Sequence, residues 1–157
     1  MLKTNKKSSW YVNGLHFQCA ACGNCCSGPG EGFIWVTEPE IKFIADYLKI
    51  AEEKLCHKYL RQVGLRFSIL EQPFNKDCVF LQKTGSGKQC AIYSVRPNQC
   101  RTWPFWQENL YSIDTWNQVA RCCPGITNGK VYSCDEIEEI LESKKWWKDD
   151  PKPAIAK

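Results

Sequence analysis

The stretch from Phe17 to Gly28 constrains this chain more than any other part of it. It reads F-Q-C-A-A-C-G-N-C-C-S-G and places Cys19, Cys22, Cys25 and Cys26 within eight residues. A C-x2-C turn can aim two sulfurs at one point while the backbone N–H groups between them face the same point. The alternative is a set of buried apolar cysteines or a disulfide knot, which leaves four soft nucleophiles crowded together without chelation. The spacing therefore indicates a metal site.

The length and the cysteine content limit the size of the fold and indicate the cellular compartment. The 157 residues leave room for one domain with one modest core. The eleven cysteines are an odd number, and no apolar stretch of the secretory type follows the polar, Lys-rich segment Met1–Ser9. We therefore expect a reducing, cytoplasmic location. The longest apolar runs, such as Phe33–Val36, are about one strand long, so we expect no membrane span.

The formal charge of +4 is a weak indication of nucleic-acid binding. Metal-bound cysteines are thiolates, and four of them around a core of charge +2 leave a net charge of about −2. Two such sites would bring the whole chain close to neutrality. There is no Lys/Arg run of the kind that marks a phosphate-binding arm, so we expect no nucleic-acid partner.

Periodicity and capping signals predict an α+β fold, in the form of a small compact domain with two or three helices, a short antiparallel sheet and metal-tied loops. Capping boxes at Thr37–Glu40 and Ser133–Glu136 predict helices, the second of which should end near Trp147. We expect a single domain over 10–147 between a loose segment 1–9 and a flexible tail 148–157. The other expected elements are a hairpin around Asn13-Gly14, a helix over 51–60, strands at 33–36, 66–70, 78–81 and 89–93, a hairpin turn through 83–88, and one helical turn over 94–101.

Four separated motifs together resemble one family. They are C-x2-C-x2-C-C at 19–26, D-C-V-F-L around Cys78, C-A-I-Y-S-V-R-P-N-Q-C-R-T-W-P-F from Cys90 to Phe105, and C-P-G at Cys123. This set resembles the CxxCxxCC, or YkgJ-like, cysteine-cluster family, which is described as zinc- or iron-chelating and includes a flagellin lysine N-methylase. The resemblance spans most of the chain and implies metal binding more directly than it implies a reaction.

The resemblance also implies a set of ligands. Three cysteines lie outside the family pattern, namely Cys56, Cys122 and Cys134, and the adjacency of Cys122 and Cys123 leaves open which of the two is the last ligand. Cys56 is interpreted as a packing residue of its helix. The cysteines that match the family positions are Cys19, Cys22, Cys25, Cys26, Cys78, Cys90, Cys100 and Cys123.

Eight thiols are the number that two four-cysteine sites require. Adjacent side chains diverge in extended backbone, so Cys25 and Cys26 are expected to serve two sites, or two metals of one cluster. One predicted site combines Cys19, Cys22 and Cys25 with Cys123, and the other combines Cys26 with Cys78, Cys90 and Cys100. A triplet completed by a remote Cys-Pro resembles ferredoxin usage. A single polynuclear site that shares all the ligands is the alternative.

The ligand type does not choose between zinc and iron, because thiolate tetrads suit both metals. The triplet spacing and the many aromatic residues favour an iron–sulfur cluster of the 4Fe-4S type. A zinc site, which more commonly uses two separated C-x2-C pairs, is the alternative.

Two arginines are the predicted cofactor-binding residues beside the thiols. Arg96 and Arg101 flank Cys100 and could donate hydrogen bonds to cluster sulfurs or ligand thiolates, or bind an anionic substrate. A surface ion pair is the alternative. The only histidines, His16 and His57, are interpreted as packing or surface residues, and no catalytic residue is nominated.

Two classes of function follow from these patterns. The first is a small metal protein that carries electrons or metal, or supports a partner, and it implies a protein redox or metal-transfer partner. The second is a metal-dependent protein-modifying enzyme such as a lysine N-methylase, and a purely structural zinc protein is a further alternative. The chain favours the first class, without catalysis of its own, because it has no glycine-rich nucleotide fingerprint and no separate substrate domain.

We predict that metal binding and folding are coupled, because a small domain with thiolate-rich loops has little else to hold those loops together. Chelation of the metal under reducing conditions should abolish cooperative thermal unfolding and most of the native circular dichroism. A thermal transition and a spectrum that stay unchanged after complete metal removal would contradict this coupling.

Overall fold

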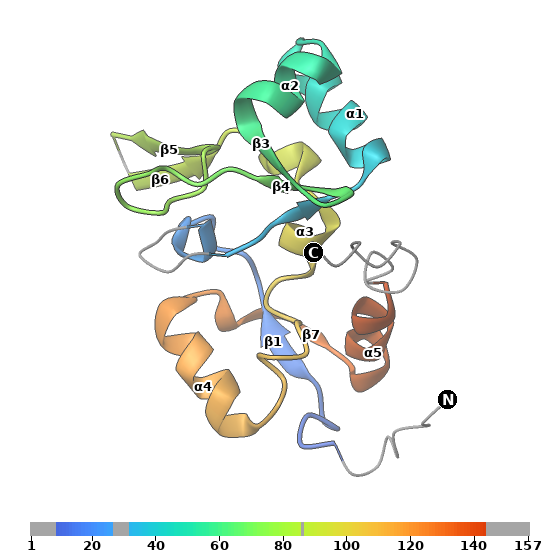
Figure 1. The fold of residues 1–157 in the computed structure, drawn as a ribbon. Coiled ribbons are helices and arrows are strands. Elements are labelled where there is room, and N and C mark those ends of the chain that lie inside the picture. The colour runs from blue at the N-terminus through green and yellow to red at the C-terminus, as the bar shows by residue number, and fades with distance from the viewer. Residues whose placement is uncertain (1–8, 27–31, 86, 144–157) are drawn as a thin grey trace. The chain divides into compact units, whose positions relative to one another are not determined.

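The computed structural model describes residues 9–26, 32–85 and 87–143, and in it the chain divides into two compact units (Figure 1). Of the described residues, the first unit contains 9–22 and 102–143, and the second contains 23–101. Helices and short antiparallel sheets in both units confirm the α+β class. The predicted tail 148–157, the predicted helix end near Trp147 and all of the segment 1–9 except Ser9 lie outside the described residues.

The first unit is built on one strand pair and two helices. Strand β1 (Leu15–Phe17) pairs antiparallel with β7 (Ile126–Tyr132), and helices α4 (Ile113–Cys122) and α5 (Cys134–Glu142) complete the unit. The hairpin expected around Asn13-Gly14 is wrong, because residues 10–13 form a turn and the partner of β1 lies far along the chain. The buried core of this unit comprises Phe105, Leu110, Trp116, Cys123, Ile126 and Ile137.

Local capping explains where the helices of the first unit begin. The Ser133 hydroxyl accepts a hydrogen bond from the Glu136 N–H, and the Glu136 carboxylate accepts one from the Ser133 N–H at 2.8 Å, which confirms the predicted capping box. Helix α4 was not predicted. Its N-cap is Ser112, whose hydroxyl accepts from the Thr115 N–H at 3.1 Å, and its apolar side buries Trp116.

The second unit contains a three-stranded sheet, a hairpin and two helices around its own core. The sheet has the order β2 (Trp35–Val36), β4 (Arg66–Ile69), β3 (Leu60–Val63), and the helices are α1 (Glu38–Leu48) and α2 (Glu52–Tyr59). The predicted capping box of α1 is confirmed. The buried core comprises Val36, Ile41, Ile44, Ala45, Leu55, Leu60, Ile69, Phe80 and Ile92.

The hairpin of the second unit is confirmed, but its strands lie elsewhere than predicted. Strand β5 (Leu81–Thr84) pairs with β6 (Gly87–Cys90), and Leu81 lies opposite Cys90. The strands predicted at 78–81 and 89–93 are therefore displaced, because residues 79 and 80 form a turn and a 3₁₀ turn, η3 (Tyr93–Val95), follows β6. The single helical turn predicted over 94–101 is divided between η3 and α3 (Asn98–Thr102).

The described part of the chain contains no helix whose length and apolar content would suit a membrane crossing.

We predict that Gly125→Ala lowers the free energy of unfolding by about 1–3 kcal/mol, because overpacking displaces well-packed neighbours. A Cβ at Gly125 would lie 2.2 Å from the Gln18 carbonyl oxygen, which is backbone and cannot move independently. Gly85→Ala is the matched control, since nothing lies within 4 Å of its Cβ. Urea unfolding of metal-loaded protein is the measurement, and equal midpoints for the two variants would refute the prediction.

Candidate metal centre

The eight predicted ligands are distributed over both units. Cys19, Cys22 and Cys123 belong to the first unit, and Cys25, Cys26, Cys78, Cys90 and Cys100 belong to the second. None of the eleven cysteines of the chain forms a disulfide. All eight thiol side chains are therefore chemically available as ligands, and each unit has its own set.

Cys25 and Cys26 point their sulfur atoms toward each other rather than apart. They lie in a 3₁₀ turn, η2 (Asn24–Cys26), and their Sγ atoms are 3.8 Å apart. The divergence expected for adjacent side chains does not occur, because that expectation applies to extended backbone and this backbone is helical. Two thiolates bound to one tetrahedral ion, each with a metal–sulfur distance of about 2.3 Å, would have a similar sulfur–sulfur distance of roughly 3.8 Å. The pair thus has a spacing that one metal centre can use.

The turn that carries this pair is held against the β5–β6 hairpin. Gly23 has a φ of +74°, which favours glycine, and a Cβ there would lie 2.9 Å from both Leu81 and Lys88 of the hairpin. The Cys26 carbonyl accepts a hydrogen bond from the Cys78 N–H at 2.7 Å. Backbone contacts therefore bring the cysteine-rich turn to the start of the hairpin.

The hairpin and α3 bring three further thiols into the same unit. The Leu81 N–H donates to the Cys78 carbonyl at 2.9 Å, and Leu81 pairs with Cys90. Cys78 and Cys90 therefore both lie at the open end of the hairpin, away from its turn. Cys100 lies in α3, where its N–H donates to the Pro97 carbonyl at 2.9 Å. Pro97 precedes α3, so Cys100 lies in the first turn of this short helix.

The pKa values of these thiols show that they are electrostatic neighbours. Burial raises the pKa of Cys100, and the adjacent Cys78, Cys25 and Cys90 raise it further. Burial also raises the pKa of Cys78 to about 11 and the pKa of Cys90. The pKa of Cys25 is raised mainly by its hydrogen bond with Cys26 and then by burial. Without a cation the thiols resist ionisation, and a bound metal ion would supply the missing positive charge.

Arg96 is the cation that acts on these thiols. It lowers the pKa values of Cys25, Cys90 and Cys100, in each case as one of several contributions. Its Nε donates to the Tyr93 carbonyl at 2.9 Å, and its guanidinium carbon lies 3.8 Å from the centre of the Tyr93 ring. This hydrogen bond and the cation–π contact hold the positive charge in place.

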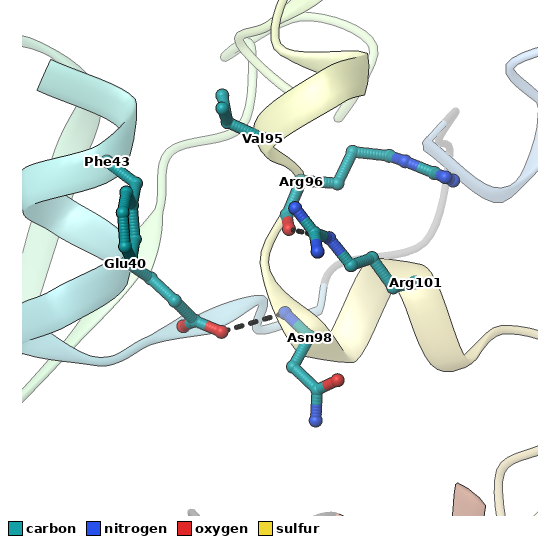
Figure 2. A pocket seen from close by; sticks show the side chains of 6 residues that line it. All are labelled: Glu40, Phe43, Val95, Arg96, Asn98 and Arg101. Atoms are coloured by element: carbon teal, nitrogen blue, oxygen red, sulfur yellow. Dashed lines mark hydrogen bonds between the residues drawn. The ribbon is translucent and has the colours of Figure 1, made fainter. Parts of the chain in front are cut away.

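Arg101 is oriented differently from Arg96, although the sequence suggested one role for both. Its Nε donates to the Arg96 carbonyl at 2.8 Å, and its Nη2 donates to the Ser94 carbonyl at 3.2 Å. Figure 2 shows Arg96 pointing away from Glu40 and Phe43, whereas Arg101 turns back toward them. These two α1 residues line a pocket with Arg101, and sequence analysis missed them because they lie more than fifty positions before it.

In the first unit, strand pairing brings two cysteine segments together. The pairing of β1 with β7 continues through the Gln18 N–H, which donates to the Gly125 carbonyl at 3.0 Å. Cys19 therefore directly follows one paired residue, Gln18, and Cys123 lies two residues before the other, Gly125. Cys19 Sγ accepts a hydrogen bond from the Ala21 N–H at 3.4 Å, as expected for a C-x2-C turn that directs N–H groups at a sulfur.

Cys122 and Cys123 differ in their surroundings. Cys123 is buried in the core of the first unit, with 9% of its surface exposed, whereas Cys122 is exposed at the end of α4. Cys25, which was predicted to join Cys19, Cys22 and Cys123, belongs to the second unit. The assignment of the last ligand and the grouping of the eight thiols stay predictions.

The donor atoms fit a thiophilic metal, but they are not yet arranged around one. Among the residues that the structure describes, no three His, Cys, Asp or Glu side chains already form a group that could hold a metal ion. The second unit nevertheless gathers five thiols, which suit zinc and iron–sulfur clusters and do not suit the hard cations that prefer oxygen.

The remaining candidates, Cys56, Cys134 and His16, lie on other elements of the fold. Cys56 of α2 is half-buried against the core of the second unit, and its pKa is raised by burial and by Glu52 rather than by another thiol. Cys134 is the first residue of α5. His16 is exposed, and its Nδ1 lies 3.1 Å from the Gly129 carbonyl oxygen.

Comparisons with known proteins agree with the cysteine pattern. The model of the CxxCxxCC family, described as "Putative zinc- or iron-chelating domain", matches residues 18–124, a range that includes all eight predicted ligands. An uncharacterized protein of Methanocaldococcus jannaschii, MJ0661, is 37% identical over 148 residues, which cover 90% of this chain and 76% of that protein. No solved structure matches significantly. The chain belongs to the CxxCxxCC family of zinc- or iron-chelating domains.

Proposed function

We propose that this protein is an iron–sulfur protein with one thiolate-ligated centre in each unit, and that it transfers electrons to or from a protein partner. The observation that carries the proposal is the gathering of five thiols in the second unit, beside Arg96. Cys78, Cys90 and Cys100 supply three of the sulfurs there, and the Cys25–Cys26 pair supplies the rest. Cys19, Cys22 and Cys123 supply the sulfurs of the first unit.

The number and chemistry of these donors support a cluster over a single zinc ion. A structural zinc ion is complete with four ligands, whereas the second unit gathers five thiols, two of them on adjacent residues. A polynuclear centre presents several metal atoms to its ligands and can accept thiolates from adjacent residues. The C-x2-C spacing of Cys19 and Cys22 in the first unit also occurs in iron–sulfur proteins.

The chain's own residues would adjust such a centre for electron transfer. A bound 4Fe-4S cluster supplies the capacity to accept and release one electron. Arg96, held over Tyr93, places a positive charge beside the thiols and thereby favours the more negative, reduced state. Backbone N–H groups, such as that of Ala21 at Cys19, donate to ligand sulfurs and act in the same direction.

The first test is the identity of the metal. Protein purified without oxygen should be brown, should absorb near about 400 nm and should contain acid-labile sulfide, because these signals come from iron bridged by sulfide. Elemental analysis and absorption spectroscopy are the measurements. A colourless protein that contains zinc and no sulfide would refute the iron–sulfur assignment while leaving the metal-binding family unaffected.

The second test is the ligand set. Cys90→Ser and Cys22→Ser should each lower the metal content of their unit by more than about half, because each removes one thiolate from a centre that needs all of them. Cys56→Ala and Cys134→Ser are the matched controls and should keep the full metal content. Loss of metal from a control variant that still shows native circular dichroism would contradict the eight-ligand set.

A further inference from the structure

The second unit contains a pocket of about 380 Å³ that no cysteine lines. The pocket lies between α1 and the segment from η3 to α3 (Figure 2). Its volume is in the lower part of the range of about 300–1,000 Å³ typical of small-molecule sites. The lining residues are Glu40, Phe43, Val95, Arg96, Asn98 and Arg101.

Arg101 is the donor that the pocket offers to a ligand. The Ser94 and Arg96 carbonyls accept from its Nη2 and Nε, so its guanidinium group is oriented before any ligand arrives. In the described part of the chain, Nη1 has no hydrogen-bond partner, and Arg101 forms no ion pair with a carboxylate. Arginine pairs with carboxylates through two parallel N–H donors, and Nη1 with Nη2 can present that edge here.

Glu40 limits the charge that the pocket accepts. Its Oε1 accepts from the Asn98 N–H at 2.8 Å, and its Oε2 accepts from the Thr37 N–H at 2.8 Å. The carboxylate therefore caps α1 and joins it to α3 instead of neutralising Arg101. Because the Arg96 guanidinium points away from Glu40 and Phe43, Arg101 supplies the positive charge that faces them, and one such charge suits a monoanion better than a phosphate dianion.

Phe43 gives the pocket an apolar side. It is 65% exposed, although the rest of the apolar stripe of α1, including Ile41 and Ile44, is buried in the core. Val95 lines the pocket as well. An exposed aromatic ring near an oriented guanidinium group suits a ligand that has an acidic end and an apolar body.

We propose that this pocket binds a small organic monocarboxylate with an aromatic or branched aliphatic body. The carboxylate pairs with Arg101, and the body packs on Phe43 and Val95. Arg101 directly follows Cys100 in α3. Arg96 lines the pocket and also acts on the thiols. The pocket does not depend on which metal the thiols hold, so this proposal stands apart from the iron–sulfur assignment.

The test is the binding of 3-phenylpropanoate to the metal-loaded full chain, measured by saturation-transfer NMR and by calorimetry. We expect a Kd of about millimolar, as is typical for a ligand of this size. Arg101→Gln should weaken binding by about tenfold or more, whereas Arg61→Gln, outside the pocket, should leave it unchanged. The uncharged analogue 3-phenylpropanamide and inorganic phosphate should both bind more weakly than the carboxylate.

A second variant keeps the test decisive if Arg101→Gln does not fold. Phe43→Ala removes an exposed side chain, so it should preserve the fold while abolishing the preference for 3-phenylpropanoate over acetate. Equal affinity of wild type and Arg101→Gln for the carboxylate would overturn the proposal. Tighter binding of phosphate, an unchanged preference in Phe43→Ala, or no carboxylate binding at about 10 mM would overturn it as well.

Discussion

The second unit brings together thiols that resist ionisation in the absence of a cation. Burial and mutual repulsion raise the pKa values of Cys78, Cys90 and Cys100, so the protein alone holds them as thiols. Cys78 precedes the turn before β5, Cys90 is the last residue of β6, and Cys100 lies in the short helix α3. Cys78 and Cys90 already pack against the core cluster that contains the buried residues of α1 and α2. A metal that replaces the protons would add a direct link between the three thiols.

The two arginines show how one short segment can serve two kinds of chemistry. Arg96 is stacked on Tyr93 and contributes positive charge to the thiols, whereas Arg101 is anchored by the Ser94 and Arg96 carbonyls and faces the pocket beside α1. The separation of roles comes from the backbone between η3 and α3, where Pro97 interrupts the helical turn. A continuous helix over 94–101 would have placed the two side chains about 140° apart without those carbonyl acceptors.

Elements with strong local signals were predicted correctly, and elements that depend on distant partners were not. Helices α1 and α5 begin at capping boxes whose hydrogen bonds form within four residues, so sequence alone locates them. By contrast, β1 pairs with β7 across more than a hundred residues, and its Asn-Gly sequence suggested a local hairpin instead. The β5–β6 hairpin was predicted from its turn, but residues 79 and 80 form a turn of their own, so β5 begins at Leu81 and not at Cys78.

The sequence by itself determined the chemistry of this protein. The eight cysteines and their spacing indicate a thiophilic metal, because thiolates suit such metals and so many neighbouring thiols favour chelation. Only the tertiary structure decided which thiols lie in which unit, that Cys25 and Cys26 converge in a 3₁₀ turn, and that Glu40 and Phe43 meet Arg101. The physical reason is that side-chain chemistry is a local property, whereas direction and proximity depend on backbone conformation and on pairing between distant segments.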